Sequence, residues 1–163
     1  MSTPKADDLP ALQDRISFLV HRINSHLMRL TNPKLQVWEV DLTESRLIVA
    51  LLENGPMSMN DIIRIMALPQ STISHQVKRL EKIGYVSRTP LERDSRVIMT
   101  ALTKEGTRVA TDANANSRHF TNRLLEAIGI EEIEVVRAAL KRADHALADP
   151  ARDMTGFGVN RTK

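Results

Sequence analysis

The chain of 163 residues contains no cysteine, which excludes disulfides, iron–sulfur clusters, cysteine-ligated zinc and thiol catalysis. Aromatic residues are scarce, with one tryptophan, one tyrosine and three phenylalanines. Glycine and proline are also few, at 6 and 7 residues. Because strands favour aromatic residues and turns favour glycine and proline, this composition predicts a mainly α-helical protein with little β-structure.

Long apolar runs are missing as well. Stretches such as Leu47–Leu52 fall far short of the roughly 20 residues that cross a bilayer. The first ten residues carry Asp7 and Asp8 and lack the basic start and apolar run of a signal peptide. We therefore expect a soluble, cytoplasmic protein without a membrane partner. The length predicts a single domain over residues 1–148, followed by a disordered tail over 149–163.

Sequence signatures of enzymes are absent too. The chain has no P-loop, no G-x-G-x-x-G, no G-x-S-x-G and no H-E-x-x-H motif. None of its five histidines forms an i, i+4 pair that would place two ligands on one helical face. We therefore expect no catalytic residues, no metal site and no cofactor.

Positive charge is concentrated in one stretch of the chain. The net charge is only +3, but residues 70–100 hold six lysines and arginines against three acidic residues. Such a stretch is typical of a nucleic-acid-binding surface, although a solvated helix face has the same composition.

Apolar residues at helical spacing predict helices over 12–30, 43–53, 61–67, 70–83 and 131–148, and a long helix from Thr103 to Ile128. Thr43, Asn60 and Thr103 are the expected N-caps. Pro33, Gly84 and Gly129 are expected to end the helices that precede them. Residues 85–89 and 97–102 alternate in polarity and predict two strands, joined by a polar hairpin tip over 90–95.

A short helix, a tight break, a second helix with a polar basic face and a charged hairpin together outline a winged helix-turn-helix. A helix of this length fits the major groove, and arginines at a hairpin tip can reach the minor groove or the phosphates. We therefore expect a mainly α fold with a small β-hairpin, in which a lobe over about 43–102 lies between long terminal helices over about 10–31 and 103–148.

Three motifs narrow the class of winged-helix protein. Asp94-Ser95-Arg96 is followed by Leu102-Thr103-Lys104-Glu105-Gly106, and this order resembles the wing signature D-x-R and L-T-x-x-G of the multiple antibiotic resistance regulator (MarR) family. Leu42-Thr43 and the run from Ser71 to Val86 are similar to patterns of the same family. Order and spacing agree with the family over about residues 10–148.

The resemblance implies a homodimer whose first and last two helices interlock, with each lobe reading half of a pseudo-palindromic operator on double-stranded DNA. It also implies a repressor that releases DNA when a small aromatic acid or its thioester binds between the dimer helices and the lobe. The heptad spacing of Ile133, Val136, Leu140 and Leu147 supports association independently. Two alternatives stay open: a winged-helix module that recruits another protein without binding an operator, and a protein that coats DNA without sequence preference.

The residues that we expect to contact DNA lie on the second helix of the motif and on the hairpin. Lys78 and Arg79 are expected to bind phosphates, and Arg96 to enter a groove with Asp94 as its positioning carboxylate. The full set is Gln70, Ser71, Thr72, Ser74, His75, Lys78, Arg79, Arg88, Arg93, Asp94 and Arg96.

The candidate effector site rests on fewer observations. Trp38 is the only tryptophan and offers either a flat apolar wall or a core residue. Cations on the first two helices are candidates for receiving a carboxylate, although any one such cation is more often a surface or dimer-interface residue: Arg22, His26, Arg29 and Arg46.

Overall fold

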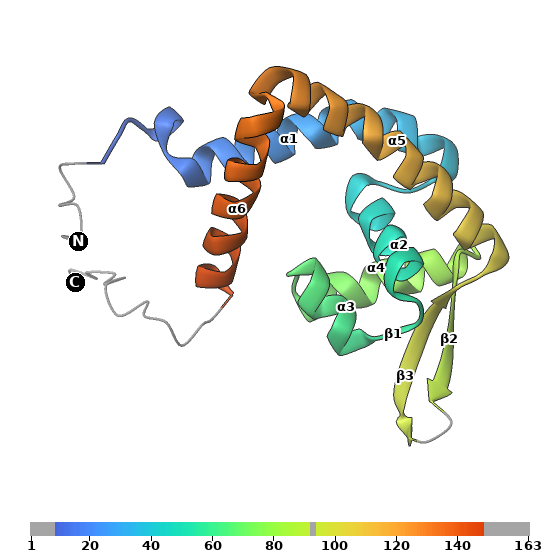
Figure 1. The fold of residues 1–163 in the computed structure, drawn as a ribbon. Coiled ribbons are helices and arrows are strands. Elements are labelled where there is room, and N and C mark those ends of the chain that lie inside the picture. The colour runs from blue at the N-terminus through green and yellow to red at the C-terminus, as the bar shows by residue number, and fades with distance from the viewer. Residues whose placement is uncertain (1–8, 92–93, 149–163) are drawn as a thin grey trace, which may run out of the picture. The chain divides into compact units, whose positions relative to one another are not determined.

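The computed structural model describes residues 9–91 and 94–148, and these form a mostly helical fold with one small antiparallel sheet (Figure 1). The expected fold class is therefore confirmed. The elements are a 3-10 turn (Leu12–Asp14), α1 (Ile16–Leu35), a second 3-10 turn (Gln36–Trp38), α2 (Leu42–Asn54), β1 (Met57–Ser58), α3 (Met59–Met66), α4 (Gln70–Lys82), β2 (Val86–Leu91), β3 (Asp94–Leu102), α5 (Lys104–Ile128) and α6 (Ile130–Leu147). The expected tail over 149–163 lies outside the described residues.

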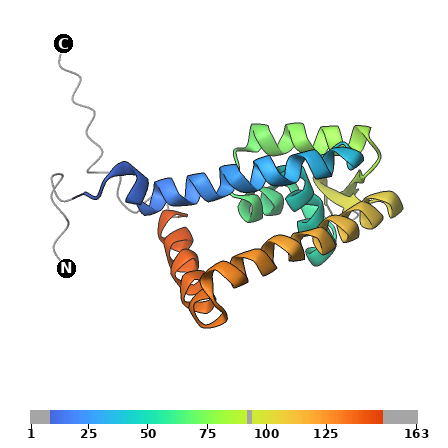
Figure 2. The same cartoon turned by 90° about the horizontal axis from the view of Figure 1, so that it is seen from above.

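The chain divides into two compact units, Met1–Ala113 and Asn114–Lys163. The core of the first unit is an apolar cluster that α2, α3, α4 and the start of β2 share with the first turns of α5. Leu47, Ile73, Val77 and Val109 are fully buried in it. In the second unit the end of α5 and α6 are joined at Gly129, whose φ of +94° ends α5 as expected. The chain bends sharply at this point (Figure 2).

The expected end of the first helix at Pro33 is wrong, because α1 continues to Leu35. Proline in the last turn removes only one backbone hydrogen bond, and the buried side chains of Thr31 and Leu35 hold that turn on the core. The Asn32 side chain accepts a hydrogen bond from the Leu42 backbone at 2.9 Å, which fixes the connection between α1 and α2.

Two expected N-caps are also wrong. Asp41, not Thr43, caps α2: its carboxylate accepts from the Glu44 backbone N–H while the Glu44 side chain accepts from the Asp41 N–H, a reciprocal capping box. Ser58, not Asn60, caps α3. Pairing of Ser58 with Met99 of β3 keeps the backbone extended up to this residue, so the helix begins directly after it.

The sheet has the strand order β1-β3-β2 and is larger than the sequence indicates. The two-residue strand β1 was not expected, because two residues carry no alternating pattern. β2 and β3 extend through Pro90, Leu91 and Asp94, so the expected hairpin tip over 90–95 is too long. A register shift between Pro90 and Leu91 accommodates proline near the end of the hairpin. The hairpin therefore projects beyond the helices of the lobe (Figure 1).

Candidate nucleic-acid interface

Helix α4 places an apolar face in the core and a polar face in solvent. Ile73, Val77 and Leu80 are fully buried. Ala67, in the left-handed region with φ of +50°, and the extended Pro69 turn the chain from α3 into α4. The polar face carries the expected DNA-contacting residues: Gln70, Ser71, Thr72, His75 and Lys78 are exposed, whereas Ser74 and Arg79 are half-buried. At 13 residues α4 is about 20 Å long, which suits the major groove.

Arg79 is held inside the lobe. Its Nη1 donates to Glu44 Oε2 at 2.6 Å, and its Nη2 donates to the backbone carbonyl of Glu39. Glu44 is buried. The ion pair connects α4 to the first turn of α2, although the two residues lie 35 positions apart in the sequence. With this geometry, Arg79 positions α4 more than it offers a free contact for a phosphate. The sequence around Arg79 did not indicate this positioning role.

Arg79→Ala is expected to lower the free energy of unfolding by about 2 kcal/mol, because the buried Glu44 carboxylate loses its charged partner. Urea unfolding followed by circular dichroism measures the loss. Lys78→Ala, a change at an exposed neighbour on the same helix, is the matched control and is expected to cost no more than about 0.5 kcal/mol. Equal stability of the two variants would contradict the positioning role.

Arg88 of β2 is also paired within the lobe. Its Nε and Nη2 donate to Glu81 Oε2 on α4 at 2.9 and 2.5 Å. The hydrogen bonds to Glu81 raise the pKa of Arg88 above its ordinary value. The pair connects the wing to the C-terminal end of α4.

At the wing, Asp94 forms a hydrogen bond with the backbone of Arg96. Its Oδ1 accepts from the backbone N–H of Arg96 at 3.0 Å, an Asx turn that shapes the start of β3. The Arg96 side chain is exposed beside it. Arg93, the other arginine expected at this tip, lies outside the described residues.

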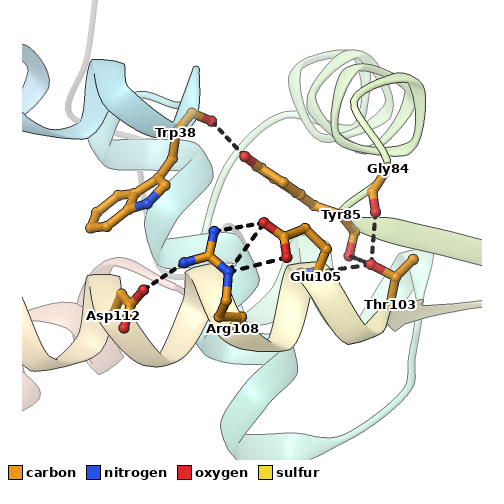
Figure 3. Close-up of polar contacts among 8 residues, drawn as sticks. Trp38, Gly84, Tyr85, Thr103, Glu105, Arg108 and Asp112 are labelled. Atoms are coloured by element: carbon orange, nitrogen blue, oxygen red, sulfur yellow. Dashed lines mark hydrogen bonds and ion pairs between the residues drawn. The ribbon is translucent and has the colours of Figure 1, made fainter.

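The L-T-x-x-G motif forms the joint between the lobe and α5, and Figure 3 shows it. The Thr103 hydroxyl donates to the Gly84 carbonyl at 2.7 Å and accepts from the Gly106 N–H at 3.0 Å, so Thr103 caps α5 as expected. Gly106 packs directly on the Tyr85 backbone: a Cβ there would lie 1.9 Å from the Tyr85 carbonyl oxygen. The motif glycine is therefore required by close approach of two backbones.

Tyr85 connects this joint to the 3-10 turn that follows α1. Its hydroxyl donates to the Trp38 carbonyl at 3.1 Å, and the indole of Trp38 points toward the side of α5 that carries Arg108 and Asp112 (Figure 3). Arg108 donates to Glu105 and to Asp112. Sequence reasoning missed this network, because no local pattern links Trp38 to residues of α5.

Burial, followed by the negative charges of Glu105 and Glu39, raises the pKa of Tyr85 above its ordinary value. Since Tyr85 is the only tyrosine, absorbance of tyrosinate is expected to rise at higher pH in the folded protein than in the chain unfolded by guanidinium. The neutral phenol is favoured in the fold, so stability is retained below about pH 10 and lost as the pH rises above the unfolded pKa. Coincident titrations would contradict a buried, hydrogen-bonded phenol.

The candidate effector residues do not form one cluster of direct contacts. Arg29 and His26 approach each other on α1, with 3.3 Å between Nη2 and Nδ1. Arg46 of α2 donates to Asn24 Oδ1 at 3.2 Å, which joins α2 to the middle of α1. Partial burial lowers the pKa of Arg46 below its ordinary value. Trp38 is half-buried, and Arg22 is exposed on α1.

Among the described residues, no group of three histidine, aspartate or glutamate side chains could hold a metal ion. No helix in the same part of the chain is long and apolar enough to cross a membrane.

The family model of the MarR family matches residues 38–97, which span α2, α3, α4 and the wing. The chain is also 23% identical over 141 residues to the transcriptional regulator TcaR of Staphylococcus aureus, which covers 83% of this chain and 93% of TcaR. The chain is therefore similar to the MarR family over this segment, and its curated relatives are transcriptional regulators, not enzymes.

Solved structures of other proteins share the fold. The structure of MepR of S. aureus in complex with DNA superimposes with a TM-score of 0.74 at 20% identity, over 82% of this chain and 98% of MepR, which shows the shared fold. CouR of Rhodococcus jostii RHA1, solved with bound p-coumaroyl-CoA, superimposes with a TM-score of 0.72 at 26% identity, over 89% of this chain and 99% of CouR.

Proposed function

We propose that this protein is a DNA-binding transcriptional regulator of the MarR family, and that it is a dimeric, sequence-specific repressor that leaves its operator when a small aromatic acid or its CoA thioester binds. The observation that carries the DNA-binding part is the exposed polar face of α4 beside a projecting wing that presents Arg96. The fold shared with MepR, which was solved on DNA, supports placing α4 in the major groove.

The proposed interface residues fall into three groups: hydrogen-bonding side chains, exposed cations and residues that position α4 and the wing. Polar residues of α4 are proposed to form hydrogen bonds with base edges and, near the start of the helix, with phosphates: Gln70, Ser71, Thr72, Ser74 and His75. Lys78 of α4 and Arg96 of the wing supply exposed positive charge. Arg93, which lies between β2 and β3 in the sequence, is proposed as a third cation of the interface. Arg79, Arg88 and Asp94 are proposed to act by holding α4 and the wing in place, through the contacts described above.

A dimer is supported by apolar side chains that the single chain leaves in solvent. On α1, Ile16, Leu19 and Ile23 repeat at helical spacing and are 74%, 41% and 50% exposed. On α6, Val136, Leu140 and Leu147 continue the heptad seam and are exposed as well. Exposed stripes of this kind mark an association surface, and two copies of one chain bury them symmetrically.

The double change Ile16→Asp and Ile23→Asp is expected to convert the dimer into a monomer of 18.3 kDa in sedimentation equilibrium, because two charges enter the apolar seam. Val37→Asp is the control: Val37 is just as exposed but lies in the 3-10 turn after α1. A wild-type chain that already sediments as a monomer would contradict the proposed dimer.

An acidic effector is supported by the cations of α1 and α2 and by the acyl-CoA bound in CouR. We propose that Arg46, Arg22 and the His26–Arg29 pair receive its negative charge and that Trp38 contacts its ring. Arg46 is the strongest candidate, since it already joins α2 to α1 through Asn24 and a carboxylate beside it would offset its lowered pKa. An effector releases DNA only if it binds the conformation that does not fit the operator more tightly.

The proposal is tested by fluorescence anisotropy with DNA from upstream of the protein's own gene, at two salt concentrations and against scrambled competitor. Tight binding with a large preference over the competitor, relieved by aromatic acids or their CoA thioesters, is the expected result. Equal affinity for both DNAs would indicate a protein that coats DNA. Absence of binding would favour an interaction module for another protein.

A further inference from the structure

The wing carries a pair of apolar residues that the fold leaves in solvent. Pro90 of β2 and Ile98 of β3 are register partners in the antiparallel ladder, so their side chains lie on the same face of the hairpin. Ile98 is 41% exposed, and Pro90 is exposed as well. Neither residue belongs to the apolar core cluster of the lobe. Packing within the chain therefore does not account for this apolar pair.

The pair lies on the face of the hairpin that is turned toward α4. Side chains alternate between the two faces of a strand, so Arg88 and Thr100, the paired residues two positions nearer the lobe, share the face of Pro90 and Ile98. On this face Arg88 reaches Glu81 of α4. Thr100 is 1% exposed against the lobe. Pro90 and Ile98 thus continue this face outward, where the hairpin projects beyond the helices (Figure 1).

The surroundings of the pair favour a nucleic-acid strand as its partner. Arg96 precedes Ile98 by two positions in β3, lies on the same side and is exposed. Apolar groups beside a cation match a sugar–phosphate chain, which offers the C–H groups of a deoxyribose next to each negative phosphate. Pairing with a strand of another protein is disfavoured, because β2 is an edge strand and Pro90 interrupts it.

We propose that Pro90 and Ile98 pack against deoxyribose rings of the DNA strand that separates two neighbouring grooves. With α4 in the major groove and the wing at the adjacent minor groove, this strand passes along the side of the hairpin that faces α4. Arg96 then supplies positive charge next to the covered sugars. The inference rests on the proposed DNA binding and adds to it a contact that carries no sequence information.

Ile98→Thr tests the contact, because threonine keeps the β-branched shape that suits a strand and replaces apolar surface with a hydroxyl. In fluorescence anisotropy, the affinity is expected to fall about fivefold, both for the DNA upstream of the gene and for scrambled DNA. The preference between the two DNAs should stay the same, since every nucleotide carries the same sugar. The salt slope should also stay the same, because no charge is removed. Ile98→Val, which keeps the apolar surface, should retain most of the affinity.

The control is Ile65→Thr, the same change at a 47% exposed position of α3. If Ile98→Thr binds both DNAs as well as Ile65→Thr does, the contact is wrong. A loss that changes the preference between the DNAs or flattens the salt slope would also overturn it. Thermal unfolding of both variants checks that the fold is kept.

Hydroxyl-radical footprinting locates the contact, since it reports which deoxyribose rings the protein covers. At protein concentrations adjusted to equal occupancy, Ile98→Thr is expected to lose protection of sugars on the strand between the two grooves and to keep it elsewhere. Unchanged protection would overturn the contact.

The two proposals fail in different ways. A wild-type protein that prefers the upstream DNA, with an Ile98→Thr variant of equal affinity, would remove the sugar contact and leave the proposed function. Equal wild-type affinity for both DNAs, weakened by Ile98→Thr, would do the reverse. A wild-type protein that binds neither DNA would overturn both.

Discussion

Gly106→Ala is expected to destabilise the protein by about 3 kcal/mol or more, although alanine is the better helix former by about 1 kcal/mol. The added Cβ would lie 1.9 Å from the Tyr85 carbonyl oxygen and 2.8 Å from the Tyr85 carbonyl carbon. Both atoms belong to backbone, which is held by the hydrogen bond from the Thr103 N–H to the Tyr85 carbonyl. Helix α5 must therefore move away from the lobe to accommodate a single methyl group.

Urea unfolding at one fixed protein concentration measures this loss, since the stability of the proposed dimer would depend on concentration. Arg118→Ala, an exposed position on the same helix, is the control and should change stability by no more than about 0.5 kcal/mol. A Gly106→Ala variant as stable as the wild type, or more stable, would contradict the close approach of α5 to Tyr85.

The second large effect is expected at the DNA interface. The double change Lys78→Ala and Arg96→Ala removes one exposed cation from α4 and one from the wing. At about 1–2 kcal/mol for each contact, the affinity for operator DNA should fall about 100-fold. The slope of log affinity against log salt should become shallower by about 2, because two fewer counterions are released.

A matched control distinguishes the loss of direct contacts with DNA from the effect of a lower net charge on the chain. Lys141→Ala with Arg142→Ala removes the same two residue types from exposed positions of α6. This variant should retain most of the affinity and the full salt slope. If both double variants lose affinity equally, α4 and the wing are not the interface, and the net charge of the chain accounts for binding.

Much of the fold could be predicted because its signals are local. Helical spacing located the helices, and Gly84 and Gly129, both with positive φ, end α4 and α5 where the sequence indicates. The true caps were also readable: Asp41 precedes Glu44 by three residues, and Ser58 precedes Asp61 likewise, both of which are capping-box spacings. The prediction of Thr43 and Asn60 as N-caps did not take this three-residue spacing into account. The continuation of α1 past Pro33 depends on burial of Leu35, which sequence alone does not reveal.

The functional surface was predictable only at the level of helix faces. Amphipathicity placed Ser71, His75 and Lys78 on the solvent side of α4 correctly. It did not show that Arg79 is bound by Glu44, because the two residues lie 35 positions apart.

We propose above that this chain reads a DNA sequence as a symmetric pair of lobes. Selection from a randomised DNA library by the purified full chain tests this proposal. We expect enrichment of a pseudo-palindromic site whose half-sites are separated by about one helical turn or a multiple of it. The same selection with the Lys78→Ala and Arg96→Ala variant should yield weak enrichment or none. A wild-type protein that enriches no sequence, although it is folded, would contradict the claim.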